Sequence, residues 1–185
     1  MQPQKLQGLE LFDVYHQVAI VLSFSFIIFL LLLSNQIRTD KRAIVIKYLI
    51  FFTFIQEIID YLGRIQFNGL SLEKDLPLHL CHYGLFMGLF SLYKRNQFCF
   101  EFTFLIGIPS ALLAIVTPDM NDYNNWTNYV TFFIHHSLII VFPLWNIFVD
   151  KLSLRKFSIF YSSFFCVIMI IPVGLVCWVT GGNYM

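Results

Sequence analysis

Residues 18–33 read VAIVLSFSFIIFLLLL, a run without a charged side chain. With its flanks, the run is long enough for a helix that crosses the hydrocarbon core of a bilayer, which takes about 20 residues. The mostly polar residues 34–38 (SNQIR) follow it, and they do not form a small-residue cleavage site. Lys5 is the one basic residue before the run. The run therefore predicts a retained transmembrane helix and not a signal peptide.

The whole chain has the composition of a membrane protein. Of its 185 residues, 58% are apolar and 12% are charged, whereas soluble domains are about 25% charged. The net charge of +1 lacks the basic excess of a nucleic-acid-binding protein. The four cysteines form no CxxC pair, so neither a disulfide framework nor a zinc ribbon is indicated.

Apolar runs separated by polar breaks predict six helices. They are expected near residues 14–35, 43–64, 77–93, 98–117, 127–149 and 157–180. The predicted fold class is therefore all-α, a polytopic bundle of about six transmembrane helices in one domain, residues 1–185. Such a chain contacts membrane lipids, and no nucleic-acid partner is expected.

Basic residues are distributed unequally between the two sets of loops. Nine lie in the connections between helices 1 and 2, 3 and 4, and 5 and 6, and three lie on the other side, at Lys5, Arg64 and Lys74. Because short cytoplasmic loops are enriched in Lys and Arg, both termini are predicted to lie on the non-cytoplasmic side.

Most polar residues within the helices fall in the half nearest that non-cytoplasmic side. The main members are His16, Gln56, Glu57, Asp60, Arg64, His79, Cys81, His82, Thr117, Asp119, His135, His136, Asn183 and Tyr184. Ionisable groups at membrane depth usually face a partner or a water-filled cavity. Two interpretations are open: a lock between helices, with Glu57 or Asp60 paired to Arg64, or a polar cavity. Two histidine clusters and a cysteine at one depth favour the cavity.

Cys81 is the candidate nucleophile. It follows Pro77, which suits a first helical position, and Asp75, which is placed to cap the helix. Unpaired N–H groups at a helix start favour a thiolate and can hold an oxyanion. Gly84 and Gly88 share its helix face and allow another helix to approach. The alternative is a small buried apolar side chain, the role assigned to Cys99, Cys166 and Cys177.

His135 and His136 lie about 100° apart on the fifth predicted helix, so at most one faces the cysteine squarely. A general base must come within hydrogen-bonding reach of the thiol. The alternative is a pair of core histidines satisfied by hydrogen bonds. Since HExxH, HxxxH and CxxC spacings are all missing from the sequence, no metal and no cofactor are expected.

Several segments together carry a family resemblance. They are Gln56-Glu57, LPLHLC at 76–81, LAIVTPD at 113–119, His136, and Gly182-Asn183-Tyr184. In order and spacing the chain resembles the YwaF-type family of bacterial integral membrane proteins, related to a eukaryotic family of transmembrane ether-phospholipid acyltransferases. The resemblance implies a bacterial cell membrane, acyl transfer through a thioester at Cys81, and a partner histidine at His136. It also implies a seventh helix after the Gly182-Asn183-Tyr184 segment, whereas the sequence given ends at Met185, and a glycine where Ser137 stands.

The resulting hypothesis is an acyltransferase that moves a fatty acyl group from a phospholipid. Cys81 attacks the ester, His136 takes its proton, and Glu57 or Asp60 orients the imidazole, while His79 helps to hold the oxyanion. Substrate contacts are expected from His82, His135, Thr117, Asp119, Asn183 and Tyr184.

Two other function classes remain open at this stage. A transporter or ligand-binding membrane protein would use the same cavity without chemistry. An assembly subunit would use the face of Gly84 and Gly88 for contact with a partner.

Overall fold

The computed structural model describes residues 10–38, 40–119 and 125–184, and these residues form helices and connecting segments without strands. The elements are α1 (Val14–Gln36), α2 (Arg42–Asn68), α3 (Leu80–Lys94), α4 (Gln97–Phe102), the π-helical turn η1 (Thr103–Gly107), α5 (Ile108–Val116), α6 (Trp126–Phe148) and α7 (Ser158–Thr180). α4, η1 and α5 follow one another without a break and form one rod. The predicted all-helical fold is confirmed.

Four helical segments are long and apolar enough to cross a membrane: α1, the α4–α5 rod, α6 and α7. α2 has sufficient length, with 27 residues, but carries Glu57, Asp60 and Arg64 along it. α3 has only 15 residues. The two helices that differ from a plain transmembrane segment carry four of the candidate site residues: Glu57 and Asp60 on α2, and Cys81 and His82 on α3.

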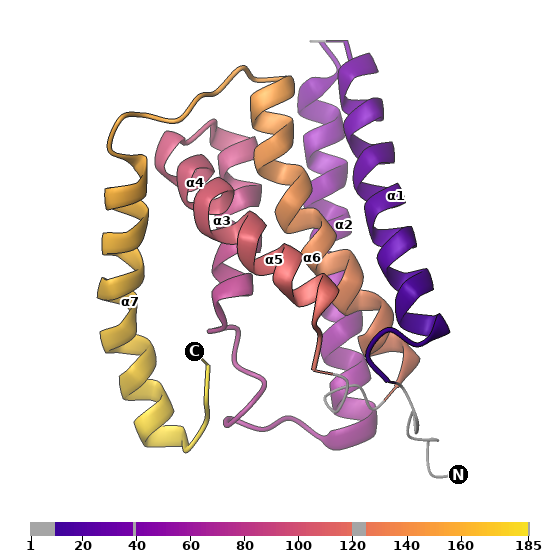
Figure 1. Ribbon diagram of the computed structural model, residues 1–185, viewed down its shortest axis with the longest axis vertical. Coiled ribbons are helices and arrows are strands. Elements are labelled where there is room, and N and C mark those ends of the chain that lie inside the picture. Colours follow the sequence, from indigo (N-terminus) through magenta and orange to yellow (C-terminus); the bar gives the residue numbers. More distant parts are fainter. Residues whose placement is uncertain (1–9, 39, 120–124, 185) are drawn as a thin grey trace.

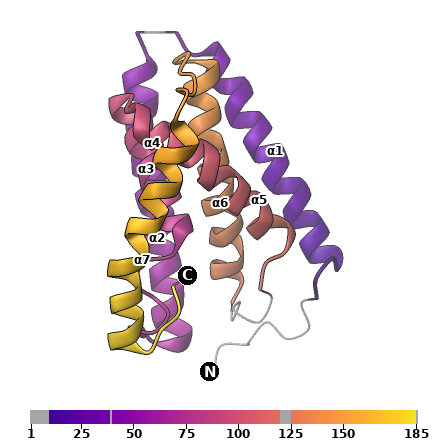
Figure 2. The same ribbon diagram turned by 60° about the vertical axis from the view of Figure 1, so that its left-hand side comes forward.

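α6 is the central helix of the bundle (Figures 1 and 2). It packs against α1, α2, α3 and the rod, and 72% of its most apolar stretch is buried, compared with 11% for α7. Buried apolar side chains such as Leu138, Ile139 and Phe142 form its core-facing surface. α7 stands at the edge and contacts the rod, at α4 and η1.

The start of α3 differs from the sequence prediction. The helix begins at Leu80 with His79 as its N-cap residue, so Pro77 precedes the helix. Asp75 does not cap it, because its carboxylate accepts hydrogen bonds from Arg64 Nη1 at 3.0 Å and from the Ser71 N–H at 2.7 Å. Cys81 is still in the first turn, as the second helical residue.

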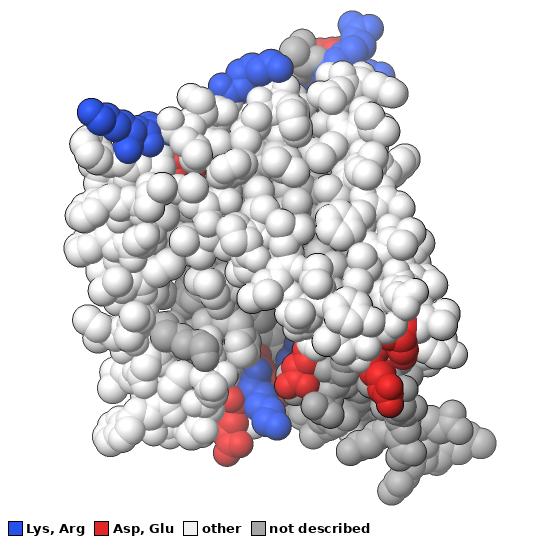
Figure 3. All heavy atoms as spheres, viewed as in Figure 1, with Lys and Arg blue, Asp and Glu red and all other residues white. Residues whose placement is uncertain are grey.

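Charged side chains gather at the two ends of the molecule, with an uncharged band between them (Figure 3). At the end rich in Lys and Arg, the Arg155 guanidinium donates two hydrogen bonds to the fully buried Glu101, at 2.9 and 2.7 Å. This pairing raises the pKa of Arg155. The uncharged band is the surface expected of a protein that lies in a bilayer.

Candidate functional site

The site is built around the contact between α3 and α6. A Cβ atom at Gly84 would lie 3.3 Å from Ile139 Cγ2, and one at Gly88 would lie 3.1 Å from Phe142 Cδ2. Successive residues of α3 thus face successive residues of α6, so the two helices run in the same direction. Cys81 lies one turn before Gly84, and His136 lies one turn before Ile139. This register places Cys81 and His136 at the same level.

The Cys81 side chain lies on the side of α3 that faces the rod. Its half-buried side chain packs against the hydrophobic core, and the Ser110 side chain is its hydrogen-bond partner. The Ser110 hydroxyl also donates to the Gly107 carbonyl at 2.9 Å. Sequence reasoning missed Ser110. Its one signal in the sequence was a hydroxyl group within residues 104–116, which are otherwise apolar.

His136 lies on the same face of α6 as Ile139, which packs against Gly84 and Gly107. Its Nδ1 atom lies 2.8 Å from the Phe132 carbonyl oxygen. Because a carbonyl oxygen can only accept, Nδ1 carries the proton and Nε2 keeps its lone pair. The imidazole is therefore held in the tautomer that accepts a proton at Nε2.

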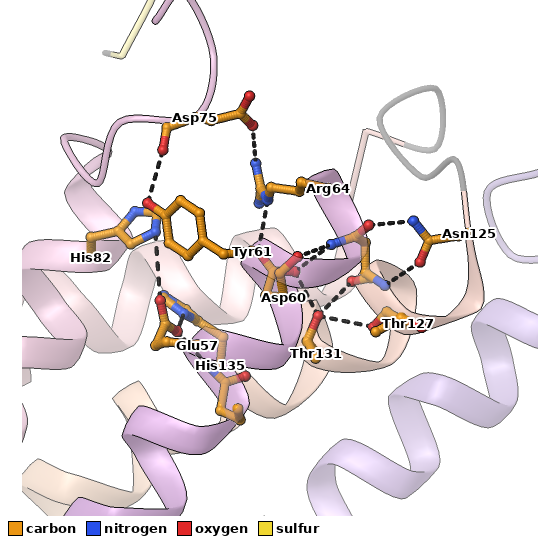
Figure 4. Close-up of polar contacts among 12 residues, drawn as sticks. Glu57, Asp60, Tyr61, Arg64, Asp75, His82, Asn125, Thr127, Thr131 and His135 are labelled. Atoms are coloured by element: carbon orange, nitrogen blue, oxygen red, sulfur yellow. Dashed lines mark hydrogen bonds and ion pairs between the residues drawn. The ribbon is translucent and has the colours of Figure 1, made fainter. Parts of the chain in front are cut away.

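Glu57 is paired with His135 and not with His136. His135 Nδ1 donates to Glu57 Oε1 at 2.6 Å, and His82 Nε2 lies 3.9 Å from Glu57 Oε2 (Figure 4). The Gln56 amide also donates to Glu57 Oε1. A carboxylate buried between α2, α3 and α6 thus holds the histidines of two helices.

Five aromatic rings form a continuous series, which we call the histidine row: Tyr184, His79, His82, His135 and His136. Ring centroids are 5.0 Å apart between Tyr184 and His79, and 6.0 Å between His79 and His82. The next two separations, to His135 and then to His136, are both 5.1 Å. The row connects the C-terminal segment to the level of Cys81.

The C-terminal segment is anchored to the connection between α2 and α3. The Tyr184 hydroxyl donates to the Leu72 carbonyl at 2.6 Å, and the Tyr184 side chain is almost fully buried. Gly182 passes so close to Glu73 that a Cβ atom would overlap the Glu73 carbonyl oxygen. The C-terminus accordingly lies beside this connection (Figure 1). Asn183 is exposed.

Asp60 belongs to a separate network that joins α2 to α6 (Figure 4). It accepts hydrogen bonds from Arg64 Nε at 2.7 Å, Asn128 Nδ2 at 2.8 Å and the Thr131 hydroxyl at 2.6 Å. Arg64 Nη1 also donates a hydrogen bond to Asp75 Oδ1. The interpretation as a lock between helices therefore holds for Asp60 and Arg64, whereas Glu57 pairs with His135. The polar cavity stays a prediction.

Thr117 and Asp119, two of the expected substrate contacts, directly follow the last residues of α5. Both are exposed at the end of α5, and the Thr117 hydroxyl donates to the Leu113 carbonyl of its own helix. Within the described part of the chain, no group of three or more His, Cys, Asp or Glu side chains is arranged to hold a metal ion.

Comparison of the chain with the curated proteins and with the solved structures found no match. The model of the TMEM164 family matches residues 11–185, a range that contains every helix described above. Together with the apolar helices, this match identifies an integral membrane protein. The chain belongs to the TMEM164 family.

Proposed function

We propose that this protein is a membrane-embedded acyltransferase, which takes a fatty acyl group from a phospholipid as a thioester on Cys81. The observation that supports the proposal is the register of α3 against α6: Cys81 and His136 each lie one turn before the contact of Gly84 with Ile139. The hydrogen bond of His136 Nδ1 to a carbonyl oxygen also leaves Nε2 as the proton-accepting nitrogen. A nucleophile beside a base of fixed tautomer is the arrangement that covalent catalysis requires.

In the acylation step, His136 Nε2 takes the proton of the Cys81 thiol, and the sulfur attacks the ester carbonyl carbon. The negative oxygen that forms accepts hydrogen bonds from the N–H groups of Leu80 and Cys81, the first two residues of α3. The N–H groups of His82 and Tyr83 already donate to the His79 carbonyl. His79, the N-cap residue, stands beside this position. The ester C–O bond then breaks, and His136 returns the proton to the departing oxygen.

An apolar cleft beside α3 suits the acyl chain. It has a volume of about 280 Å³ and separates α3 from α7, with Leu80, Tyr83, Phe102, Phe165, Met169, Val173 and Tyr184 among its lining residues. The space-filling view shows the surface hollowed below α5, between α7 and α6 (Figure 3). Leu80 is the neighbour of Cys81, so a chain in the cleft would present its ester near the thiol.

The proposal includes an orientation in the membrane. We infer that all six helical segments cross the bilayer, with both termini and the histidine row toward the non-cytoplasmic side. The support is the excess of Lys and Arg in the loops at the opposite end. α2 can cross despite its polar residues because Glu57, Asp60 and Arg64 are partnered within the bundle.

Intact-protein mass spectrometry tests the proposal. After incubation with phosphatidylcholine vesicles, the wild-type protein should gain the mass of one acyl chain, which neutral hydroxylamine removes. Cys81→Ser should lose this adduct, whereas the matched variant Cys99→Ser should keep it. An unmodified wild-type protein, or full acyl transfer by Cys81→Ser, would contradict the proposal, and binding of lipid without an adduct would favour a transporter or ligand-binding protein.

A further inference from the structure

We propose that the Ser110 hydroxyl is a further catalytic group of this site, which donates a hydrogen bond to the Cys81 sulfur whenever that sulfur is a thiolate. The inference rests on the proposed function and adds a residue to it. Cys81 is a thiolate at two points of the reaction, as the nucleophile that attacks the phospholipid ester and as the group that leaves the thioester. Because both points involve the same thiolate, one hydrogen-bond donor serves both directions of the transfer.

The packing of α3 against the rod is antiparallel and close. A Cβ atom at Gly88 would lie 3.1 Å from Thr103 Cγ2, and a Cβ atom at Gly84 would lie 3.6 Å from Gly107 Cα. A step of four residues back along α3 is therefore matched by a step of four residues forward along the rod. Glycines at such a contact let two helix backbones approach, so short side chains in the following turn can meet.

Ser110 lies opposite Cys81 in this antiparallel register. A further step of three residues along each element leads from Gly84 to Cys81 and from Gly107 to Ser110. The hydrogen bond between the Ser110 and Cys81 side chains agrees with this position. Both side chains are half-buried. The contact thus follows from the backbone register as well as from the hydroxyl group itself.

The Ser110 hydroxyl can change its role with the charge on the sulfur. Its proton is donated to the Gly107 carbonyl, at 2.9 Å. With that proton engaged, Ser110 Oγ can only accept, so the neutral thiol donates to it. Once His136 Nε2 has taken the thiol proton, the sulfur keeps the electron pair and can only accept. Rotation about the Cβ–Oγ bond then turns the hydroxyl proton to the sulfur, and Ser110 keeps this proton throughout.

The sulfur needs a donor of this kind. A charge taken out of water without a hydrogen bond is costly, and a hydroxyl group bonds an anion more strongly than a neutral carbonyl oxygen. The N–H group of Cys81 is a second donor beside the sulfur, but in the proposed mechanism it is directed to the negative oxygen of the ester carbonyl. Ser110 supplies a donor that this oxygen does not share.

Alkylation of Cys81 tests this hydrogen bond without a lipid substrate. In a parent protein with the other three cysteines changed to serine, kept in detergent micelles, iodoacetamide reacts with the Cys81 thiolate. The variants are Ser110→Ala, Ser110→Val and Ser110→Thr. Valine and threonine have nearly the same shape, and only threonine carries a hydroxyl group. The control Ser23→Ala removes a buried hydroxyl of α1 that donates to the Ala19 carbonyl at 2.8 Å.

We expect Ser110→Ala and Ser110→Val to be alkylated about 10-fold more slowly than the parent protein at neutral pH, the lower end for loss of a hydrogen bond to a charged group. Ser110→Thr and Ser23→Ala should react at close to the parent rate. With the native cysteines retained, the initial rate of acyl-adduct formation from phosphatidylcholine vesicles should follow the same order. A role in packing alone would slow Ser110→Thr as much as Ser110→Val.

Alkylation of Ser110→Ala and Ser110→Val at the parent rate, or equal slowing of Ser110→Val and Ser110→Thr, would overturn this inference and leave the Cys81 thioester standing. A wild-type protein that gains no acyl adduct would instead overturn the proposed function, and with it the catalytic role of Ser110.

Discussion

Gly182 is the residue that allows the C-terminal segment to reach the site. Its backbone lies against Glu73, and any side chain would meet the Glu73 carbonyl. The segment that it admits carries Tyr184, whose ring contacts His79 at the start of the histidine row. The absence of a side chain at Gly182 thus allows the C-terminal segment to pack against the connection between α2 and α3.

Gly182→Ala should therefore lower the stability of the protein by about 1–3 kcal/mol, the usual cost of overpacking. The measurement is the apparent Tm in detergent micelles. Gly174→Ala is the matched control, because a Cβ atom at Gly174 on α7 meets nothing within 4 Å. A Gly182→Ala protein with the same apparent Tm as the wild type would contradict the close approach of Gly182 to Glu73.

At the scale of elements, α3 depends on its glycine face. The sequence predicted that Gly84 and Gly88 would let another helix approach beside Cys81, and this prediction is confirmed by the contacts of Gly84 and Gly88 with α6 and η1. A Cβ atom at Gly88 would lie 3.1 Å from both Phe142 and Thr103. α3 is thus held between two elements, and its position sets that of Cys81.

Gly88→Leu should move α3 away from α6. We expect a loss of about 1–3 kcal/mol in stability and a fall in acyl-enzyme formation of about 100-fold, because a displacement of about 1 Å suffices for such a loss. The measurements are the apparent Tm in detergent micelles and the amount of acyl adduct found on the intact protein by mass spectrometry. Phe90→Leu, at an exposed position of the same helix, should leave both values nearly unchanged. A Gly88→Leu protein that carries as much acyl adduct as the wild type would show that the packing of α3 does not position the thiol.

The whole molecule has two chemically different ends. At one end, the Asp150 side chain, which has no exposed area, is paired with Arg42 and Arg95, and Glu101 is paired with Arg155. At the other end lie the histidine row and the network of Asp60 and Arg64. Since this second end faces the non-cytoplasmic side in our proposal, substrate would enter from the outer leaflet.

Cysteine labelling in intact cells tests this orientation. In a background with the four native cysteines changed to serine, Lys74→Cys should react with a membrane-impermeant maleimide. Lys41→Cys and Lys156→Cys should react only after the cells are permeabilised. All three side chains are exposed, so accessibility reports the side of the membrane. The reverse pattern would place the histidine row toward the cytoplasm.

The sequence by itself determined the helical class, the boundaries of most helices and the unequal distribution of charge. These features follow from composition and from apolar runs, which act over neighbouring residues. It also predicted that most of the site residues lie in the same half of their helices, because position along a transmembrane helix determines depth in the membrane. The start of α3 was the exception, since Asp75 is bound by Arg64 from another segment.

Only the tertiary structure decided which side chains meet. Glu57 and His135 are 78 residues apart in the chain, and Tyr184 and Leu72 are 112 apart. The sequence left Glu57 and Asp60 as equivalent partners of a histidine, but rotation of α2 against α6 directs Glu57 to His135 and Asp60 to Thr131. Helical periodicity determines which residues of one helix share a face. The rotation of each helix against its neighbours is fixed by packing, which no local pattern contains.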